Sequence, residues 1–149
     1  MLFRSLRDGI AEYVKRLSAY TSVQWIEVAD ERTPDGASHA EEERIRRTEG
    51  ERLIKRLPSD AFVIALAIEG KEMDSVSLSR RMADWMSGGK SHFVFVIGGS
   101  LGLSDEVMRR ADLSLSFSKM TFPHQIMRLL LLEQLYRSFR ILNNAPYHK

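Results

Sequence analysis

Apolar residues recur at intervals of three and four along much of the chain, and this period predicts amphipathic helices. Pro58 ends one such segment, Gly88 and Gly89 end another, and Ser75 and Ser104 are suited to cap the starts of two helices. The predicted helices span residues 6–17, 39–57, 75–87, 104–110 and 123–142.

Other segments carry the pattern of β-strands and alternate with the predicted helices. The runs FVIALAI and FVFVI are continuously apolar and too short for buried helices, which is typical of strands covered on both faces. The predicted strands span residues 23–28, 62–68, 93–97 and 113–117, and residues 30–38 predict a loop. The alternation predicts an α/β fold with a mostly parallel sheet and helices on both faces.

The last predicted helix is apolar on almost every side. A helix of this kind must be buried nearly all round, and in so small a domain a second copy of the chain is the cover that we expect. Its apolar residues include Ile126, Met127, Leu129 to Leu132, Leu135, Tyr136, Phe139 and Ile141.

The length and composition are those of one compact domain, so we expect residues 1–149 to form a single domain. The apolar runs are far shorter than the roughly 20 residues of a membrane helix. The start MLFRSLRDGI lacks the apolar stretch of a signal peptide. We therefore expect a cytoplasmic protein without a membrane partner.

The chain has no cysteine, which excludes disulfides, thiolate nucleophiles and cysteine-based zinc sites. Its four histidines lack the spacing of metal ligands, so no metal is predicted. The net charge of +2 permits an anionic partner but is weaker than that of a free-standing nucleic-acid binder. Charge alone leaves RNA binding undecided.

The sequence IGGSLG follows the strand predicted at 93–97 and precedes a helix. In doubly wound sheets, ligands bind at the carboxyl ends of strands, where glycines allow close approach of the backbone. A plain tight turn explains such a glycine pair equally often. The spacing matches neither the dinucleotide motif nor the P-loop, which disfavours those cofactors.

Residues 116–125, SFSKMTFPHQ, form a strand-to-helix connection rich in apolar and hydroxyl groups and without glycine. We expect this connection to be held in a defined shape. The residues alone support two interpretations equally, a buried connection whose aromatic rings pack and a ligand-binding loop.

The strings FVFVIGGSLGL and LSLSFSKMTFPHQIMRLLLLEQLYRSFRI, the pattern from Glu49 to Leu57 and the ending APYHK resemble the bacterial pseudouridine N3-methyltransferases of the SPOUT class. The similarity extends over essentially the whole chain. It implies a homodimer with a C-terminal trefoil knot, a feature that periodicity cannot reveal. It also implies S-adenosylmethionine as the methyl donor and, as substrate, a pseudouridine in 23S rRNA of the assembled ribosome.

The resemblance also implies which residues bind. For the methyl donor these are Leu66, Gly98, Phe117, Ser118, Lys119, Met120, Thr121 and Phe122. For the RNA base they are Arg137, Tyr147, His148 and His124, with Arg137 and His148 as the catalytic candidates. A cation beside the uracil-like ring would stabilise the anion that develops there.

Plainer interpretations of these residues stay open at this point. Arg137 has Glu133 one turn earlier as a partner for an ion pair, and a chain end is often disordered. The other arginines of the helices are more often solvated than bound to phosphate, although two copies of the chain together would be able to grip it.

Members of this family begin with a short apolar strand and a Gly-Lys turn, whereas this sequence starts almost inside the first helix. Residues 1–3 are too short to replace the strand, and a misassigned start or a truncated reading frame is the explanation that we prefer. Two alternative functions therefore stay open. One is a catalytically impaired knotted dimer that binds the donor or RNA, and the other is a SPOUT methyltransferase with a different RNA target such as tRNA.

Overall fold

The computed structural model describes residues 2–149 and, within the first helix, side chains from Arg4 onward. It divides into two compact units, between which the chain passes repeatedly. One unit comprises residues 2–25, 73–89 and 121–149, and the other comprises residues 26–72 and 90–120. The prediction that residues 1–3 are too short to replace a strand includes Met1, which lies outside the described residues. Within residues 2–149, no helix combines the length and hydropathy of a membrane span.

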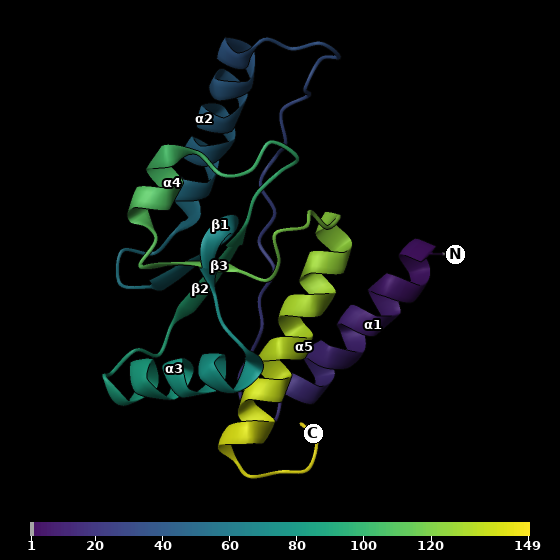
Figure 1. The fold of residues 1–149 in the computed structure, drawn as a ribbon, viewed down its shortest axis with the longest axis vertical. Coiled ribbons are helices and arrows are strands. Elements are labelled where there is room, and N and C mark those ends of the chain that lie inside the picture. Colours follow the sequence, from purple (N-terminus) through teal and green to yellow (C-terminus); the bar gives the residue numbers. More distant parts are fainter. Residues whose placement is uncertain (1) are drawn as a thin grey trace. The chain divides into compact units, whose positions relative to one another are not determined.

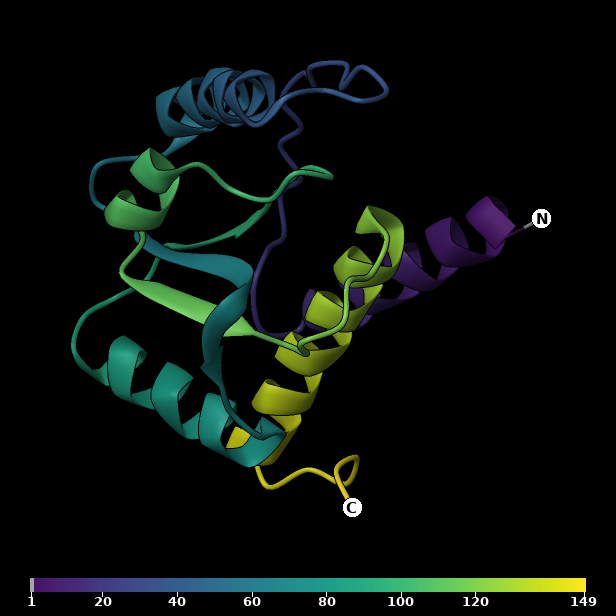
Figure 2. The same ribbon diagram turned by 45° about the horizontal axis from the view of Figure 1, so that its top comes forward.

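The unit of residues 26–72 and 90–120 is built on a three-stranded, fully parallel sheet in the order β2-β1-β3, as Figure 2 shows. This confirms the predicted α/β class with a parallel sheet. Its elements are α2 (His39–Arg56), β1 (Phe62–Glu72), β2 (Phe93–Ile97), α4 (Asp105–Arg110) and β3 (Leu113–Ser116).

The pairing of the central strand β1 with β3 is interrupted after Leu66. Leu66 pairs with Leu115 of β3, and so does Lys71, so residues 67–70 bulge out between two paired stretches. A Cβ atom at Gly70 would lie 2.8 Å from backbone atoms of β3. The close approach of the two chains therefore requires glycine there.

Helices α2 and α4 cover one face of this sheet through a continuous apolar core (Figure 2). Val63 of β1, Val96 of β2 and Val107 of α4 are buried at its centre, and Leu53 and Ile54 of α2 pack against them. Ser38 and Ser104 accept hydrogen bonds from the Glu41 and Val107 amides and so cap α2 and α4.

The other unit contains the helices α1 (Leu2–Leu17), α3 (Ser75–Ser87) and α5 (His124–Leu142), with α1 and α3 both packed on α5 (Figure 1). Ile10, Leu17 and Leu132 are buried where α1 meets α5, and the rings of Tyr20 and Phe139 stack beside them. Much of the apolar surface of α5 stays partly exposed, including Ile126, Met127, Leu130, Ile141 and Leu142.

The prediction of a strand at residues 23–28 is wrong, because this segment runs as an extended connection outside the sheet. Val23 packs into the core of α1 and α5 instead. Farther along, side chains of α2 satisfy the backbone: Arg52 donates to the Ala29 carbonyl at 2.9 Å, and Glu49 accepts from the Glu31 amide at 3.1 Å. Residues 23–28 have no partner strand in the sheet that residues 2–149 form, so β-propensity alone was misleading.

Candidate functional site

The register of the sheet brings three of the predicted donor-binding positions to one edge. Leu66, which is buried, pairs on one side with Ile97 and on the other with Leu115. Gly98 directly follows Ile97, and Phe117 follows Leu115 by two residues. The turn after β2 and the loop after β3 therefore leave the sheet on either side of Leu66, at the carboxyl ends where ligands bind in parallel sheets.

The turn after β2 is compact and needs glycine. The Gly102 amide donates to the Gly99 carbonyl at 3.0 Å, and Gly102 has a φ of 84°, in the left-handed region. A Cβ atom at Gly98 would lie 2.9 Å from the carbonyl carbon of Gly102 and 3.0 Å from Leu103. The glycines thus allow the close packing of this turn.

Helix α2 supports this turn from behind. The residue Glu49 is only 9% exposed, and a Cβ atom at Gly99 would lie 3.3 Å from its Oε1 atom. Burial raises the pKa of Glu49, and its hydrogen bond from the Glu31 amide opposes that rise. Arg46 donates to the Leu101 carbonyl at 3.2 Å. Sequence reasoning missed both side chains, because nothing near them in the chain points to a turn more than 50 residues away.

The loop after β3 is held in a defined shape, as predicted. The Ser116 hydroxyl donates to the Ser118 carbonyl at 3.0 Å, and the Ser118 hydroxyl accepts from the Met120 amide at 3.0 Å. Met120 is 73% exposed, although it is a large apolar side chain. Lys119 is exposed too, and Phe117 is half-buried.

This edge of the sheet offers the groups that a nucleoside with a thioether-like part would need. Backbone amides and carbonyls of the glycine turn are suited to a purine edge, and the uncovered Met120 offers apolar surface that a ligand would bury. The remaining predicted donor contacts, Thr121 and Phe122, follow in the chain and belong to the other unit. Among residues 2–149, no group of three or more acidic or histidine side chains is arranged to hold a metal ion.

The chain end folds back onto α5 instead of being disordered. Asn144 adopts a φ of 52°, and the Ala145 amide donates to the Arg140 carbonyl at 2.9 Å, which closes the helix with a left-handed turn. The Arg140 guanidinium then donates to the Pro146 carbonyl at 3.3 Å. These bonds fix the direction of the last three residues.

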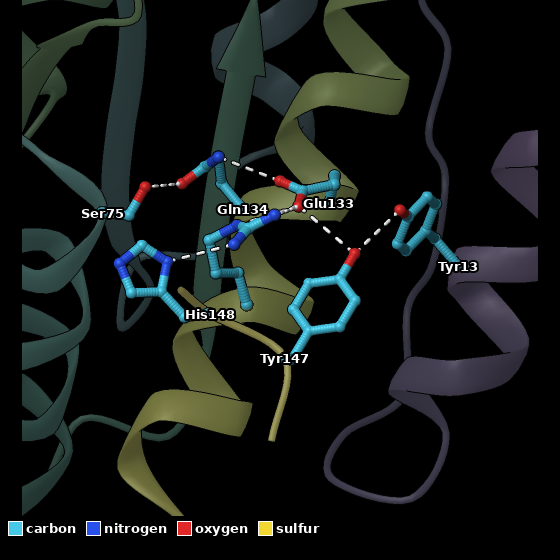
Figure 3. Close-up of polar contacts among 7 residues, drawn as sticks. Tyr13, Ser75, Glu133, Gln134, Tyr147 and His148 are labelled. Atoms are coloured by element: carbon cyan, nitrogen blue, oxygen red, sulfur yellow. Dashed lines mark hydrogen bonds and ion pairs between the residues drawn. The ribbon is translucent and has the colours of Figure 1, made fainter. Parts of the chain in front are cut away.

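Tyr147 lies at the centre of a polar cluster between α1 and α5 (Figure 3). Its hydroxyl is 3.0 Å from the Tyr13 hydroxyl and 3.3 Å from the Glu133 carboxylate, and its ring packs edge-on against Tyr136. Burial, the bond to Tyr13 and the charge of Glu133 raise the pKa of Tyr147 far above its ordinary value. The hydroxyl donates its hydrogen bond to the Glu133 carboxylate.

Arg137 joins the cluster to the end of the tail. It forms the predicted ion pair with Glu133, with its Nε atom 2.9 Å from Oε1, and this bond raises the pKa of Arg137. Its Nη1 atom lies 3.0 Å from Nδ1 of His148, and its guanidinium lies 4.7 Å from the centre of the Tyr147 ring. Arg137 thus forms the ion pair with Glu133 and also contacts the tail, while its predicted role toward the RNA base stays a prediction.

His124 is not part of this cluster. It begins α5, thirteen residues before Arg137, which corresponds to about 20 Å along the helix. The structure therefore brings together Arg137, Tyr147 and His148, which are three of the four residues predicted to bind the RNA base. Sequence reasoning missed Tyr13, which contacts Tyr147 from the opposite end of the chain.

Comparison with known proteins identifies the family of this chain. The sequence model of a family described as "Predicted SPOUT methyltransferase" matches residues 3–148. The chain is 58% identical over 146 residues to Ribosomal RNA large subunit methyltransferase H of Bifidobacterium animalis subsp. lactis (strain AD011), covering 98% of this chain and 92% of that relative. It is 56% identical over 144 residues to the protein of the same name from Exiguobacterium sp. (strain ATCC BAA-1283 / AT1b), covering 97% and 91%. With a match of this extent, the chain belongs to the SPOUT methyltransferase family.

Proposed function

We propose that this protein transfers the methyl group of S-adenosylmethionine to N3 of a pseudouridine in the 23S rRNA of the assembled ribosome. The observation that carries the proposal is the near full-length identity of 56–58% to relatives named as methyltransferases of large-subunit ribosomal RNA. Identity at this level makes a shared reaction the simplest expectation, and the two groups of residues described above supply the chemistry that the reaction requires.

The donor site is proposed at the carboxyl edge of the sheet. Leu66, the turn at Gly98 and the loop of residues 117–122 would hold the adenosine and methionine parts, chiefly through backbone groups and apolar contact. The Gly98 turn and the loop after β3 are both held in shape by hydrogen bonds of their own. A preformed site of this kind costs little conformational entropy on binding.

The base of the RNA is proposed to contact Arg137, Tyr147 and His148. The donor supplies an activated methyl group on a positively charged sulfur. The N3 atom of the base would have to give up its proton to solvent water before it accepts that methyl group. The protein must align N3 with the methyl group and stabilise the anionic ring, for which a guanidinium and hydrogen-bond donors are suited. His124 remains a separate proposed RNA contact.

The working form is proposed to be a cytoplasmic homodimer with the C-terminal trefoil knot of its family. The apolar residues of α5 that stay partly exposed, such as Ile126 and Leu130, favour a second copy as their cover. The modest net charge of +2 suits a substrate in which ribosomal surface contributes to docking.

Methyl transfer from labelled S-adenosylmethionine tests the proposal. Ribosomes that lack the modification should accept label, while free tRNA should not. Arg137→Gln should abolish most of the transfer, and Arg56→Gln, an exposed arginine at the end of α2, should not. Binding of the donor without transfer would favour a catalytically impaired dimer, and label in tRNA would favour a different RNA target.

A further inference from the structure

We infer that His148 presents a hydrogen-bond donor, its Nε2–H group, to the substrate base and is not the group that removes the proton from N3. The inference rests on the proposed function and deepens it, because it assigns the role of one residue and the kind of base that the cluster selects. It follows from the direction of one hydrogen bond.

The Nδ1 atom of His148 lies 3.0 Å from the Nη1 atom of Arg137. A guanidinium has only donors, so Nδ1 must be the acceptor in this bond. A neutral imidazole that accepts at Nδ1 carries its proton on Nε2. Figure 3 shows this second ring nitrogen pointing away from the nitrogen that makes the bond. The free side of the ring is therefore an N–H group.

Arg137 is fixed by its other partners, so the direction of this bond is imposed on His148. Its side chain is 24% exposed and that of Glu133 is 18% exposed, and the two form an ion pair. Glu133 is itself held by Gln134, whose Nε2 atom donates to it at 2.9 Å. The Gln134 carbonyl in turn accepts from the Ser75 hydroxyl at 2.7 Å, as Figure 3 shows. The chain of bonds runs from α3 through α5 to the tail.

The competing state of the ring is the charged imidazolium, in which both nitrogens donate. Asp74 at the start of α3 is the nearby carboxylate that would favour it. The pKa of Asp74 is lowered chiefly by hydrogen bonds from the Ser77 amide and hydroxyl. The charged ring would have to give up its bond to Arg137, which has no acceptor.

Two donors of this cluster can then face the substrate, the remaining N–H groups of the Arg137 guanidinium and His148 Nε2–H, because the Tyr147 hydroxyl already donates to Glu133. A ring with carbonyl oxygens on both sides of a ring N–H matches them, as in uracil and pseudouridine. A base with an exocyclic amino group, such as cytosine, presents a donor to a donor. The donors stabilise the ring anion after its proton has passed to water, and the anion then takes the methyl group.

Substitutions of His148 separate the two roles. The amide nitrogen of Gln can occupy the place of Nε2 and donate, but it cannot take a proton, whereas Ala offers neither function. We expect His148→Gln to keep methyl transfer to ribosomes within about tenfold of the unmodified chain. We expect His148→Ala to lose on the order of a hundredfold, the usual effect of removing one such donor. Equal losses in both variants would overturn the inference, provided that donor affinity by calorimetry and circular dichroism are unchanged.

A second measurement does not depend on activity. Nitrogen NMR of the full chain with labelled histidine should show an unprotonated Nδ1 and a protonated Nε2 for His148, whose signals are identified by their loss in His148→Gln. A proton on Nδ1, or on both nitrogens at neutral pH, would contradict the inference. If no variant transfers methyl groups, the proposed function fails, while the NMR result still decides the protonation of His148.

Discussion

The hydroxyl groups of Tyr13 and Tyr147 lie 3.0 Å apart, although 134 residues separate them in the sequence. Tyr13 comes from α1 and Tyr147 from the tail after α5, so the first helix helps to place the last residues of the chain (Figure 3). The same phenol of Tyr147 reaches Glu133 at 3.3 Å. The tail is thus positioned by two helices, and this arrangement leads to the first prediction.

Tyr147 should not ionise near the ordinary tyrosine pKa of about 10. Its pKa is raised in the folded protein, by burial first and then by Tyr13 and Glu133. Below about pH 10, the pKa of tyrosine in the unfolded chain, the stability that depends on the neutral phenol is fully present. It is lost as the pH rises from there through the raised pKa of the folded state. In a tyrosinate absorbance titration, Tyr147→Phe should leave the amplitude around pH 10 unchanged. A drop equal to one of the four tyrosines would contradict this.

Glu133→Gln should destabilise the protein far more than the same substitution in an exposed ion pair. The substitution removes the negative charge that pairs with Arg137, in a place where both side chains are less than a quarter exposed. We therefore expect a loss of about 1–3 kcal/mol in the free energy of unfolding. Glu12 pairs with Arg16 at the same four-residue spacing, with exposures of 51% and 42%. Glu12→Gln should cost about 0.5 kcal/mol or less.

Urea unfolding measures both changes in the free energy of unfolding. Glu133→Gln should also lower methyl transfer, because it loosens Arg137 and Tyr147, while donor affinity stays the same. Equal effects of the two substitutions on stability would show that the cluster around Tyr147 is not held as described.

Gly50→Ala should be destabilising, although alanine normally favours a helix interior over glycine by about 0.5–1 kcal/mol. A Cβ atom at Gly50 would lie 2.9 Å from the Cβ of Ser104, the residue that caps α4. We expect a loss of about 1–3 kcal/mol from this overlap.

Ser104→Gly is the matched second variant, because it removes the obstructing side chain and costs only a few tenths of a kcal/mol as a cap. In the double variant, Gly50→Ala should become neutral or stabilising. If the two effects simply add in urea unfolding, the contact between α2 and α4 does not explain the glycine.

Gly98→Ala should weaken binding of S-adenosylmethionine by about tenfold or more, equivalent to about 1.4 kcal/mol. The new Cβ atom would meet the Gly102 backbone at 2.9 Å, so the turn beside Leu66 must shift. Gly88→Ala is the control, since a Cβ atom there would be 3.4 Å from the nearest atom and its φ is −79°. Calorimetry that gives equal donor affinity for both variants would exclude the Gly98 turn from the donor site.

Much of the fold could be predicted because short apolar runs and helical periods are local signals. Residues 62–68 and 93–97 are strands of the parallel sheet, although β1 continues to Glu72 after its bulge. Residues 23–28 carry a local strand signal too, but no strand pairs with them. Pairing depends on distant residues, which a local pattern does not contain.

Only part of the candidate site could be predicted from the sequence as well. Resemblance to a family predicts Leu66, Gly98 and Arg137. The sheet register explains why Leu66 lies beside the Gly98 turn, and the spacing on α5 explains why Arg137 pairs with Glu133. The partners Glu49 and Tyr13 gave no signal, since each acts on a segment about 50 or more residues away. His124 lies outside the cluster of Arg137, Tyr147 and His148, because it begins α5 thirteen residues before Arg137.

The central claim is methylation of N3 in a ribosomal pseudouridine, and analysis of the modified nucleoside tests it most directly. Ribosomes without the modification are incubated with the protein and labelled S-adenosylmethionine, and their 23S rRNA is digested for mass spectrometry. We predict that the label appears in N3-methylated pseudouridine. Label in any other nucleoside, or its absence from 23S rRNA while the donor binds, would contradict the account.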